Sequence, residues 1–114
     1  MTIEELVEKS FKNAQEHGFW EDYEFITQNM LSTKHNDELI NNAIGNRLML
    51  IVSEVAEAQE GLRHNDINNF KEELADVAIR LADLCGGLDI DLESEIQKKM
   101  KVNKNRPYKH GKEF

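Results

Sequence analysis

Two apolar runs with alternating steps of three and four residues are the feature that most constrains the fold of this chain. The first lies in a segment, residues 44–62, that predicts a long helix, and the second covers residues 70–88. This spacing places the large side chains of each run on one face of an α-helix, as in a packed helical seam. Residues 64–66 between the runs are cap-forming, so we expect the two helices to pack as an antiparallel hairpin.

The segments before and after this pair also predict helices. Thr2 and Glu5 have the spacing of a capping box, and the helix that they open is expected to end at residues 17–18. Residues 19–42 have no clean period, and they predict a short helix plus loops.

After the second run, Gly86 and Gly87 are expected to punctuate the chain before a further helix over residues 92–100. Pro107 disfavours helix at the residue before it, so the end of the chain beyond Val102 is expected to be irregular. No segment has the sustained alternation of a strand.

The fold class predicted from these patterns is all-α: a small bundle of about four to five helices with two long core helices. With 114 residues, the chain (1–114) is expected to form one domain, whose residues 98–114 make a basic, partly irregular C-terminal segment. A domain of this size buries a modest fraction of its surface, so we expect homo-oligomerisation, as a homodimer or homotetramer, to complete the bundle.

The charges are distributed unevenly along the chain. The net charge is −8, but residues 98–114 contain seven of the fourteen basic side chains, which leaves 21 acidic and 7 basic side chains in the first 97 residues. The acidic body argues against nucleic acid and membrane as partners. A basic tail can bind a polyanion, and it can equally be a segment that only balances the charge of the acidic body.

Cellular location is inferred from cysteine usage and from the first residues. Cys85 is the only cysteine, which excludes an intramolecular disulfide and fits a core thiol in a reducing compartment. The first residues lack the pattern of a signal peptide, and no apolar run of 18 residues exists. We therefore expect a cytoplasmic protein.

Two acidic pairs lie on the predicted hairpin, Glu54 with Glu57 and Glu73 with Asp76. Residues three apart lie on one face of a helix about one turn apart, so each pair can share a cation, and a hairpin can bring the four carboxylates together. Four carboxylates this close repel one another unless a cation lies among them, and oxygen ligands select Mg²⁺, with Mn²⁺ as a substitute. A solvated acidic helix face remains an equally open interpretation of the spacing. A di-iron centre is disfavoured because no His stands three residues after a Glu.

These motifs resemble those of a known family, the MazG-like all-α nucleoside triphosphate pyrophosphohydrolases, in which ExxE is followed by ExxD across a helix turn. The resemblance extends over residues 48–58 and 72–81, returns in the Asn-x-x-Arg-Pro-x-x-His-Gly form of residues 103–111, and includes His17-Gly-Phe-Trp20. It therefore touches most of the chain.

The resemblance implies hydrolysis of nucleoside triphosphates, and of deoxynucleoside triphosphates in particular, to monophosphate and pyrophosphate in nucleotide-pool control. Mg²⁺ would bridge phosphate oxygens to Glu54, Glu57 and Asp76. Glu73 would either complete the coordination or act as general base, and both roles stay open. All four carboxylates are thus candidate catalytic and metal-binding residues.

Six further side chains are candidates for substrate binding. The basic tail offers donors to the outer phosphates, although it can also be simply solvated. Trp20 offers a flat face to a base, but a single Trp in a small domain is more often part of the core. Arg80 follows Asp76 by one turn and can brace the acidic cluster or contact phosphate. The tail candidates are Lys101, Asn105, Arg106 and Lys109.

Two alternatives remain open at this level. The same fold can act on another substrate, such as phosphoribosyl-ATP. Alternatively, the chain is a non-enzymatic helical dimer that binds a partner or RNA through its basic tail, and such a protein would show no metal dependence.

Overall fold

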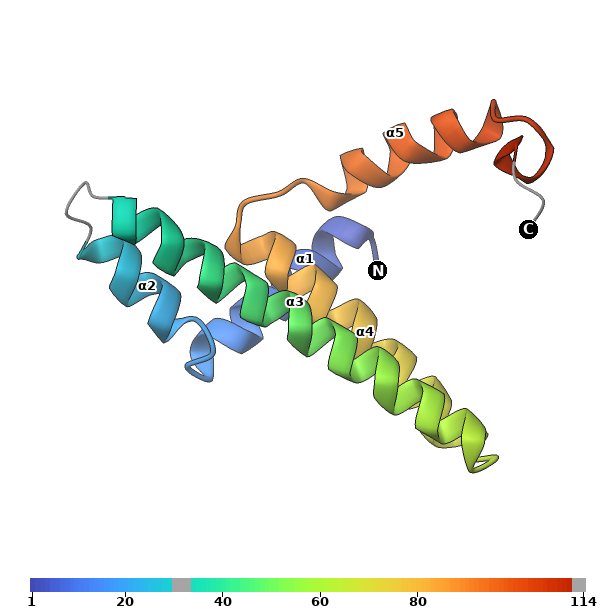
Figure 1. Cartoon of the computed structure of the whole chain (residues 1–114), viewed down its shortest axis with the longest axis horizontal. Coiled ribbons are helices and arrows are strands. Elements are labelled where there is room, and N and C mark those ends of the chain that lie inside the picture. Colours follow the sequence, from blue (N-terminus) through green and yellow to red (C-terminus); the bar gives the residue numbers. More distant parts are fainter. Residues whose placement is uncertain (30–33, 112–114) are drawn as a thin grey trace.

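The antiparallel hairpin is confirmed. The structure of the protein, a computed structural model, describes residues 1–29 and 34–111, and in this part of the chain it contains five α-helices, one 3-10 helix and no strand (Figure 1). Helices α3 (Lys34–Arg63) and α4 (Ile67–Gly87) lie side by side along much of their length. Between them Asp66 caps α4, accepting a hydrogen bond of 3.0 Å from the Asn69 amide.

Helix α3 begins ten residues before the predicted start. The predicted short helix is present as α2 (Glu21–Gln28), and residues 19–20 and 29 lie in turns, but residues 34–42 are helical where loops were predicted. This half of α3 packs mainly against the short α2, with Ala43 and Arg47 buried and Asn41 and Asn42 exposed. A helix with one narrow contact face needs few apolar residues, so its period was invisible in the sequence.

Helix α1 (Ile3–Glu16) packs across α4, and its predicted capping box is confirmed. Gly86 and Gly87 punctuate the chain as predicted: they form the last turn of α4, which ends at Gly87, and a non-helical connection follows before the next helix begins. Because these glycines have no side chain, neighbouring residues can approach α4 closely. A Cβ on Gly86 would lie 2.4 Å from Phe11 Cβ, and one on Gly87 would lie 2.1 Å from the Trp20 ring.

Trp20 is the centre of the small core. It is 1% exposed, and its ring makes edge contacts with Phe11 and Tyr23 at centroid distances of 5.5 and 5.3 Å. Its Nε1 donates a 2.7 Å hydrogen bond to Asp83 Oδ1 on α4. Together these contacts join α1, α2 and α4 at one end of the hairpin.

Helix α5 (Leu92–Lys104) leaves the body as an arm that ends in η1 (Tyr108–Gly111), with an irregular connection at the predicted position around Pro107 (Figure 1). Its first turns lie near α1, but every side chain from Lys98 to Lys109 is exposed. The all-α fold class is therefore confirmed, with one helix standing apart. No helix in the described ranges is long and apolar enough to cross a membrane.

Candidate metal site and adjoining cavity

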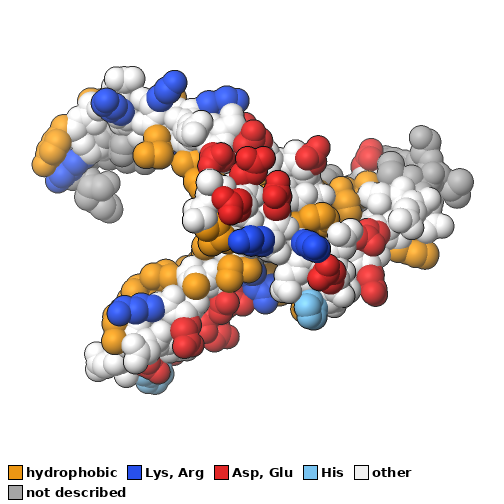
Figure 2. All heavy atoms as spheres, turned by 180° about the vertical axis from the view of Figure 1, so that it is seen from behind, with side chains coloured by type: hydrophobic (Ala, Val, Ile, Leu, Met, Phe, Trp, Pro, Cys, Tyr) orange, Lys and Arg blue, Asp and Glu red, His pale blue; other side chains and the backbone are white. Residues whose placement is uncertain are grey.

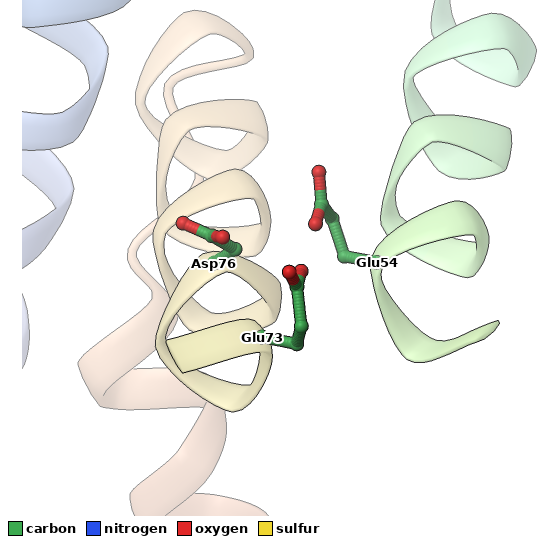
Figure 3. A group of neighbouring side chains, drawn as sticks. All are labelled: Glu54, Glu73 and Asp76. Atoms are coloured by element: carbon green, nitrogen blue, oxygen red, sulfur yellow. The ribbon is translucent and has the colours of Figure 1, made fainter. Parts of the chain in front are cut away.

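Three of the four predicted carboxylates come together between α3 and α4. Glu54 on α3 faces Glu73 and Asp76 on α4, and one oxygen from each lies within 4.8 Å of the others (Figure 3). The hairpin produces this meeting because its helices run antiparallel, so that position 54 lies opposite the 73–76 turn. We call these three residues the acidic cluster.

Glu57 is not a member of the acidic cluster. Its side chain is exposed, one turn farther along α3 towards the tip of the hairpin. Its charge nevertheless contributes to raising the pKa of Glu73. The prediction that four carboxylates converge is thus correct for three, while Glu57 stands at the edge.

Among the described residues, Arg80 is the basic side chain that contacts the acidic cluster, and it does so through Glu54. Arg80 Nε donates a 2.8 Å hydrogen bond to Glu54 Oε1, and this contact, followed by a hydrogen bond with Glu73, lowers the pKa of Glu54. Arg80 therefore braces the cluster, which is one of its two predicted roles.

The opposite shift occurs at Glu73, whose pKa is raised to about 7. The largest cause is the hydrogen bond with Glu54, followed by desolvation and by the charges of Glu54, Glu57 and Asp76. At neutral pH Glu73 is therefore partly protonated, and this proton offsets some of the negative charge that a bound cation could offset. Oxygen donors, excess negative charge and a proton held near neutrality are the properties expected where a hard divalent ion binds.

A cavity of about 710 Å³ opens beside the acidic cluster, between α1, α2 and the hairpin. Glu54, Asp76 and Arg80 line one part of it. This volume lies within the range of small-molecule sites. The remaining wall includes polar and apolar side chains from α1, α3, α4 and the α1–α2 turn, among them Asn13, Phe19, Asn46, Leu50 and Ile79.

Phe19 lines the cavity but was not among the predicted substrate-binding residues, although its segment, residues 17–20, is part of the family resemblance. It follows Gly18, whose φ of +83° turns the chain sharply after α1, and its ring is 67% exposed. The turn directs Phe19 outward and Trp20 inward. An aromatic residue directly after a helix-ending glycine was the available signal.

Trp20 itself requires a correction. The expectation that it stacks on a base is wrong for this structure, because its ring is enclosed and one face is covered by Arg47, whose Cζ lies 4.1 Å from the ring centroid. Its hydrogen bond to Asp83 partly opposes the raised pKa that desolvation gives this half-buried carboxyl. The alternative considered from the sequence, a core tryptophan, is correct.

Arg47 was also missed, and it fixes one wall of the cavity. Its guanidinium donates to the carbonyl oxygens of Ala43 and Phe19, each at 2.9 Å, and to both carboxylate oxygens of Asp22 at 2.7 and 3.3 Å. The ion pair lowers the pKa of Asp22. A single arginine thus connects α2, α3 and the α1–α2 turn.

The predicted phosphate-binding residues of the tail lie elsewhere. Lys101, Asn105, Arg106 and Lys109 are exposed on the α5 arm, and none of them lines the cavity. Asn105 instead caps α5 by donating a 3.1 Å hydrogen bond to the Lys101 carbonyl. Within one chain, the structure does not bring these residues to the acidic cluster.

Compared with protein-family models, with curated proteins and with solved structures, the chain has no match in any of the three.

Proposed function

We propose that the protein is a Mg²⁺-dependent hydrolase that cleaves nucleoside triphosphates to monophosphate and pyrophosphate. The observation that carries this proposal is the acidic cluster of Glu54, Glu73 and Asp76 at the edge of a 710 Å³ cavity. A triphosphate brings negative charge, which an acidic pocket accepts only with cations between the two. The resemblance of the acidic motifs to those of MazG-like pyrophosphohydrolases supports the same assignment.

The acidic cluster fits a hard divalent cation. Its donors are all carboxylate oxygens, and Arg80 balances only the charge of Glu54. Glu54 and Asp76 would hold the ion, while Glu57 would add negative charge from the next turn of α3. When bound, Mg²⁺ neutralises charge on the phosphates and on the leaving group.

The side chains of the cluster then have distinct tasks. Arg80 keeps Glu54 ionised and in place through the 2.8 Å contact. Glu73, whose pKa of about 7 lies nearest neutrality, accepts the proton of the attacking water on its carboxylate. The water oxygen bonds to the α-phosphorus, the bond from that phosphorus to the bridging oxygen breaks, and pyrophosphate leaves with the electron pair.

The far end of the cavity suits a nucleoside. Phe19 presents an exposed ring on which a base can stack, and the amides of Asn13 and Asn46 offer donors and acceptors to a base or sugar. The Arg47 contacts hold the Phe19 backbone in position.

The test is a product assay with purified protein, Mg²⁺ and each nucleotide in turn, including phosphoribosyl-ATP as a separate substrate. Mass analysis is expected to find monophosphate and pyrophosphate, whereas diphosphate with orthophosphate would contradict the proposal. Glu54→Gln is expected to be inactive. Glu72→Gln is the matched control, because it removes the same charge from a position on α4 outside the acidic cluster.

Calorimetry with Mg²⁺ alone separates the enzyme from a non-enzymatic helical dimer. An enzyme of this kind binds Mg²⁺ with a heat that Glu54→Gln reduces and Glu72→Gln does not. Equal heats for all three proteins, together with no turnover, would favour the binding protein.

A further inference from the structure

The side chains that line the cavity are rich in hydrogen-bond acceptors. Five carboxylates and two guanidinium groups are among them. Both guanidinium groups already have acceptors, because Arg80 donates to Glu54 and Arg47 donates to Asp22 and to two backbone carbonyls. On the face drawn in Figure 2, acidic side chains gather on the body and basic side chains along the α5 arm. A ligand with N–H donors or bound cations therefore suits this cavity better than one with acceptors only.

Four of the five carboxylates have their charge compensated or solvated. Glu54 and Asp76 belong to the acidic cluster, where the proposed metal binds. Asp22 has an arginine on both of its oxygens, at 2.7 and 3.3 Å. Glu21 is exposed, so water solvates it. The fifth carboxylate, Asp83, has a different environment.

Asp83 is partly buried, and only one of its oxygens is bonded. Oδ1 accepts the 2.7 Å hydrogen bond from Trp20 Nε1. Oδ2 has no hydrogen-bond partner in the described part of the chain, where no fully enclosed side-chain oxygen lacks one, so Oδ2 is open to the cavity that Asp83 lines. Desolvation raises the pKa of this carboxyl, which means that its charged form has lost part of its hydration. An N–H donor at Oδ2 would replace that hydration.

The position of Asp83 matches that of the base in a bound nucleotide. Asp83 follows Asp76 on α4 by seven residues, which places it on the same face of the helix and roughly 10 Å along it. This separation is comparable with that between the α-phosphate of a nucleotide and the far edge of its base. Trp20, which holds Asp83, directly follows Phe19, whose exposed ring lines the same cavity. Adjacent residues therefore hold the ring for stacking and the carboxylate.

We propose that Asp83 selects cytosine and adenine nucleotides, whose bases have an amino group where uracil and hypoxanthine have an oxo group. The proposal rests on the proposed function. Oδ2 accepts an N–H of the amino group, as carboxylates do from cytosine in nucleic-acid recognition. An oxo group at the same position turns lone pairs towards the carboxylate, so the hydrogen bond is lost and repulsion is added. The amides of Asn13 and Asn46 can serve the neighbouring ring nitrogen in either protonation state.

The first test compares substrates that differ at this group, dCTP with dUTP and dATP with dITP. The wild-type kcat/KM is expected to be at least about 10-fold higher for the amino member of one or both pairs. Asp83→Asn is expected to remove the preference, because the Trp20 indole holds the amide oxygen and so turns the amide nitrogen, a donor, towards the cavity. Glu21→Gln is the matched control. It makes the same carboxylate-to-amide change at an exposed position of the cavity wall, and it is expected to keep the preference.

Two outcomes of this test would overturn the proposal while leaving the proposed function in place. One is equal kcat/KM values within both pairs for the wild-type protein. The other is an unchanged preference in Asp83→Asn, which would show that Asp83 only anchors Trp20.

A binding measurement tests the proposal without turnover, and it needs only the wild-type protein if Asp83→Asn fails to fold. Trp20 is the single tryptophan of the chain, so its indole N–H gives one signal in a ¹H–¹⁵N NMR spectrum, and this group contacts Asp83. Deoxycytidine or deoxyadenosine is expected to shift the signal with at least about 10-fold tighter binding than deoxyuridine or deoxyinosine. An inactive wild type with this binding preference would refute only the proposed function. Equal binding of the amino and oxo nucleosides would overturn selection by Asp83.

Discussion

The two ends of the hairpin differ in how much of their structure one chain can supply. At the Trp20 end, α1, α2, α3 and α4 meet around an enclosed ring, and Arg47 satisfies four acceptors. At the tip, the main contacts of α3 and α4 in the described part of the chain are with each other, and Leu62 and Ile67 are about half exposed. The acidic cluster lies between the two ends. One chain therefore builds the wall of the cavity, whereas the tip and the arm need further contacts.

The largest expected effect is on the activity of the acidic cluster, which lies between the two ends of the hairpin. Asp76→Asn should lower turnover at least about 100-fold, because a metal-binding charge is lost from the site where negative charge develops on the leaving group. Helicity by circular dichroism should stay unchanged, since removing one of several crowded charges relieves repulsion. Loss of helicity would show instead that Asp76 has a structural role.

A substitution at the packed end should have the next largest effect. Gly87→Ala places a Cβ about where the Trp20 ring lies, 2.1 Å away, and overpacking of this kind costs about 3 kcal/mol. Gly45→Ala is the control, because nothing lies within 4 Å of its added Cβ and alanine favours the helix by about 1 kcal/mol. The urea concentration at the midpoint of unfolding should therefore fall for Gly87→Ala and rise for Gly45→Ala. Equal changes would mean that the Trp20 end is less tightly packed than described.

Trp20→Phe should have a smaller effect at the same end. It keeps an aromatic ring but removes the donor to Asp83, which lies in a partly desolvated position. The expected loss of unfolding free energy is about 1–2 kcal/mol, the usual cost of leaving one polar group unsatisfied. No loss would show that water replaces the indole donor at Asp83.

The smallest effect is a pH dependence in the absence of metal. The pKa of Glu73 is 4.5 in an unfolded chain and about 7 here, so between these values the folded protein binds the proton more tightly. Stability should therefore fall as the pH rises from about 5 to 8. The raised pKa of Asp83 also makes stability fall as the pH rises. The lowered pKa values of Glu54 and Asp22 affect stability only below about pH 4.5. Glu73→Gln should flatten the slope and Glu72→Gln should not, and added Mg²⁺ should restore stability at pH 8.

The parts of the fold that follow local rules were predictable. The Thr2–Glu5 capping box and the 64–66 turn follow from cap chemistry, and the meeting of Glu54 with Glu73 and Asp76 follows from the helix period once the two helices pack antiparallel. Gly86 and Gly87 marked the end of the second long helix, but the sequence did not reveal that they also admit the Phe11 and Trp20 side chains.

The cavity wall was unpredictable for a related reason. Arg47 reaches Asp22 across 25 positions, and Trp20 reaches Asp83 across 63. No local pattern marks such pairs. The position of the α5 arm is likewise a property of the tertiary structure. The sequence could suggest a polyanion as the ligand of its basic residues, but it could not predict where these residues lie.

The contacts of Arg47 have one consequence for ligands. Because its guanidinium is 4.1 Å above the Trp20 ring and also holds Asp22 and the Phe19 carbonyl, the turn beside the cavity cannot swing away without breaking several bonds at once. This wall is preorganised, and little conformational entropy is lost there when a molecule enters. Selectivity at that end should therefore come from shape matching to a rigid surface, with association unhindered by a slow closing motion.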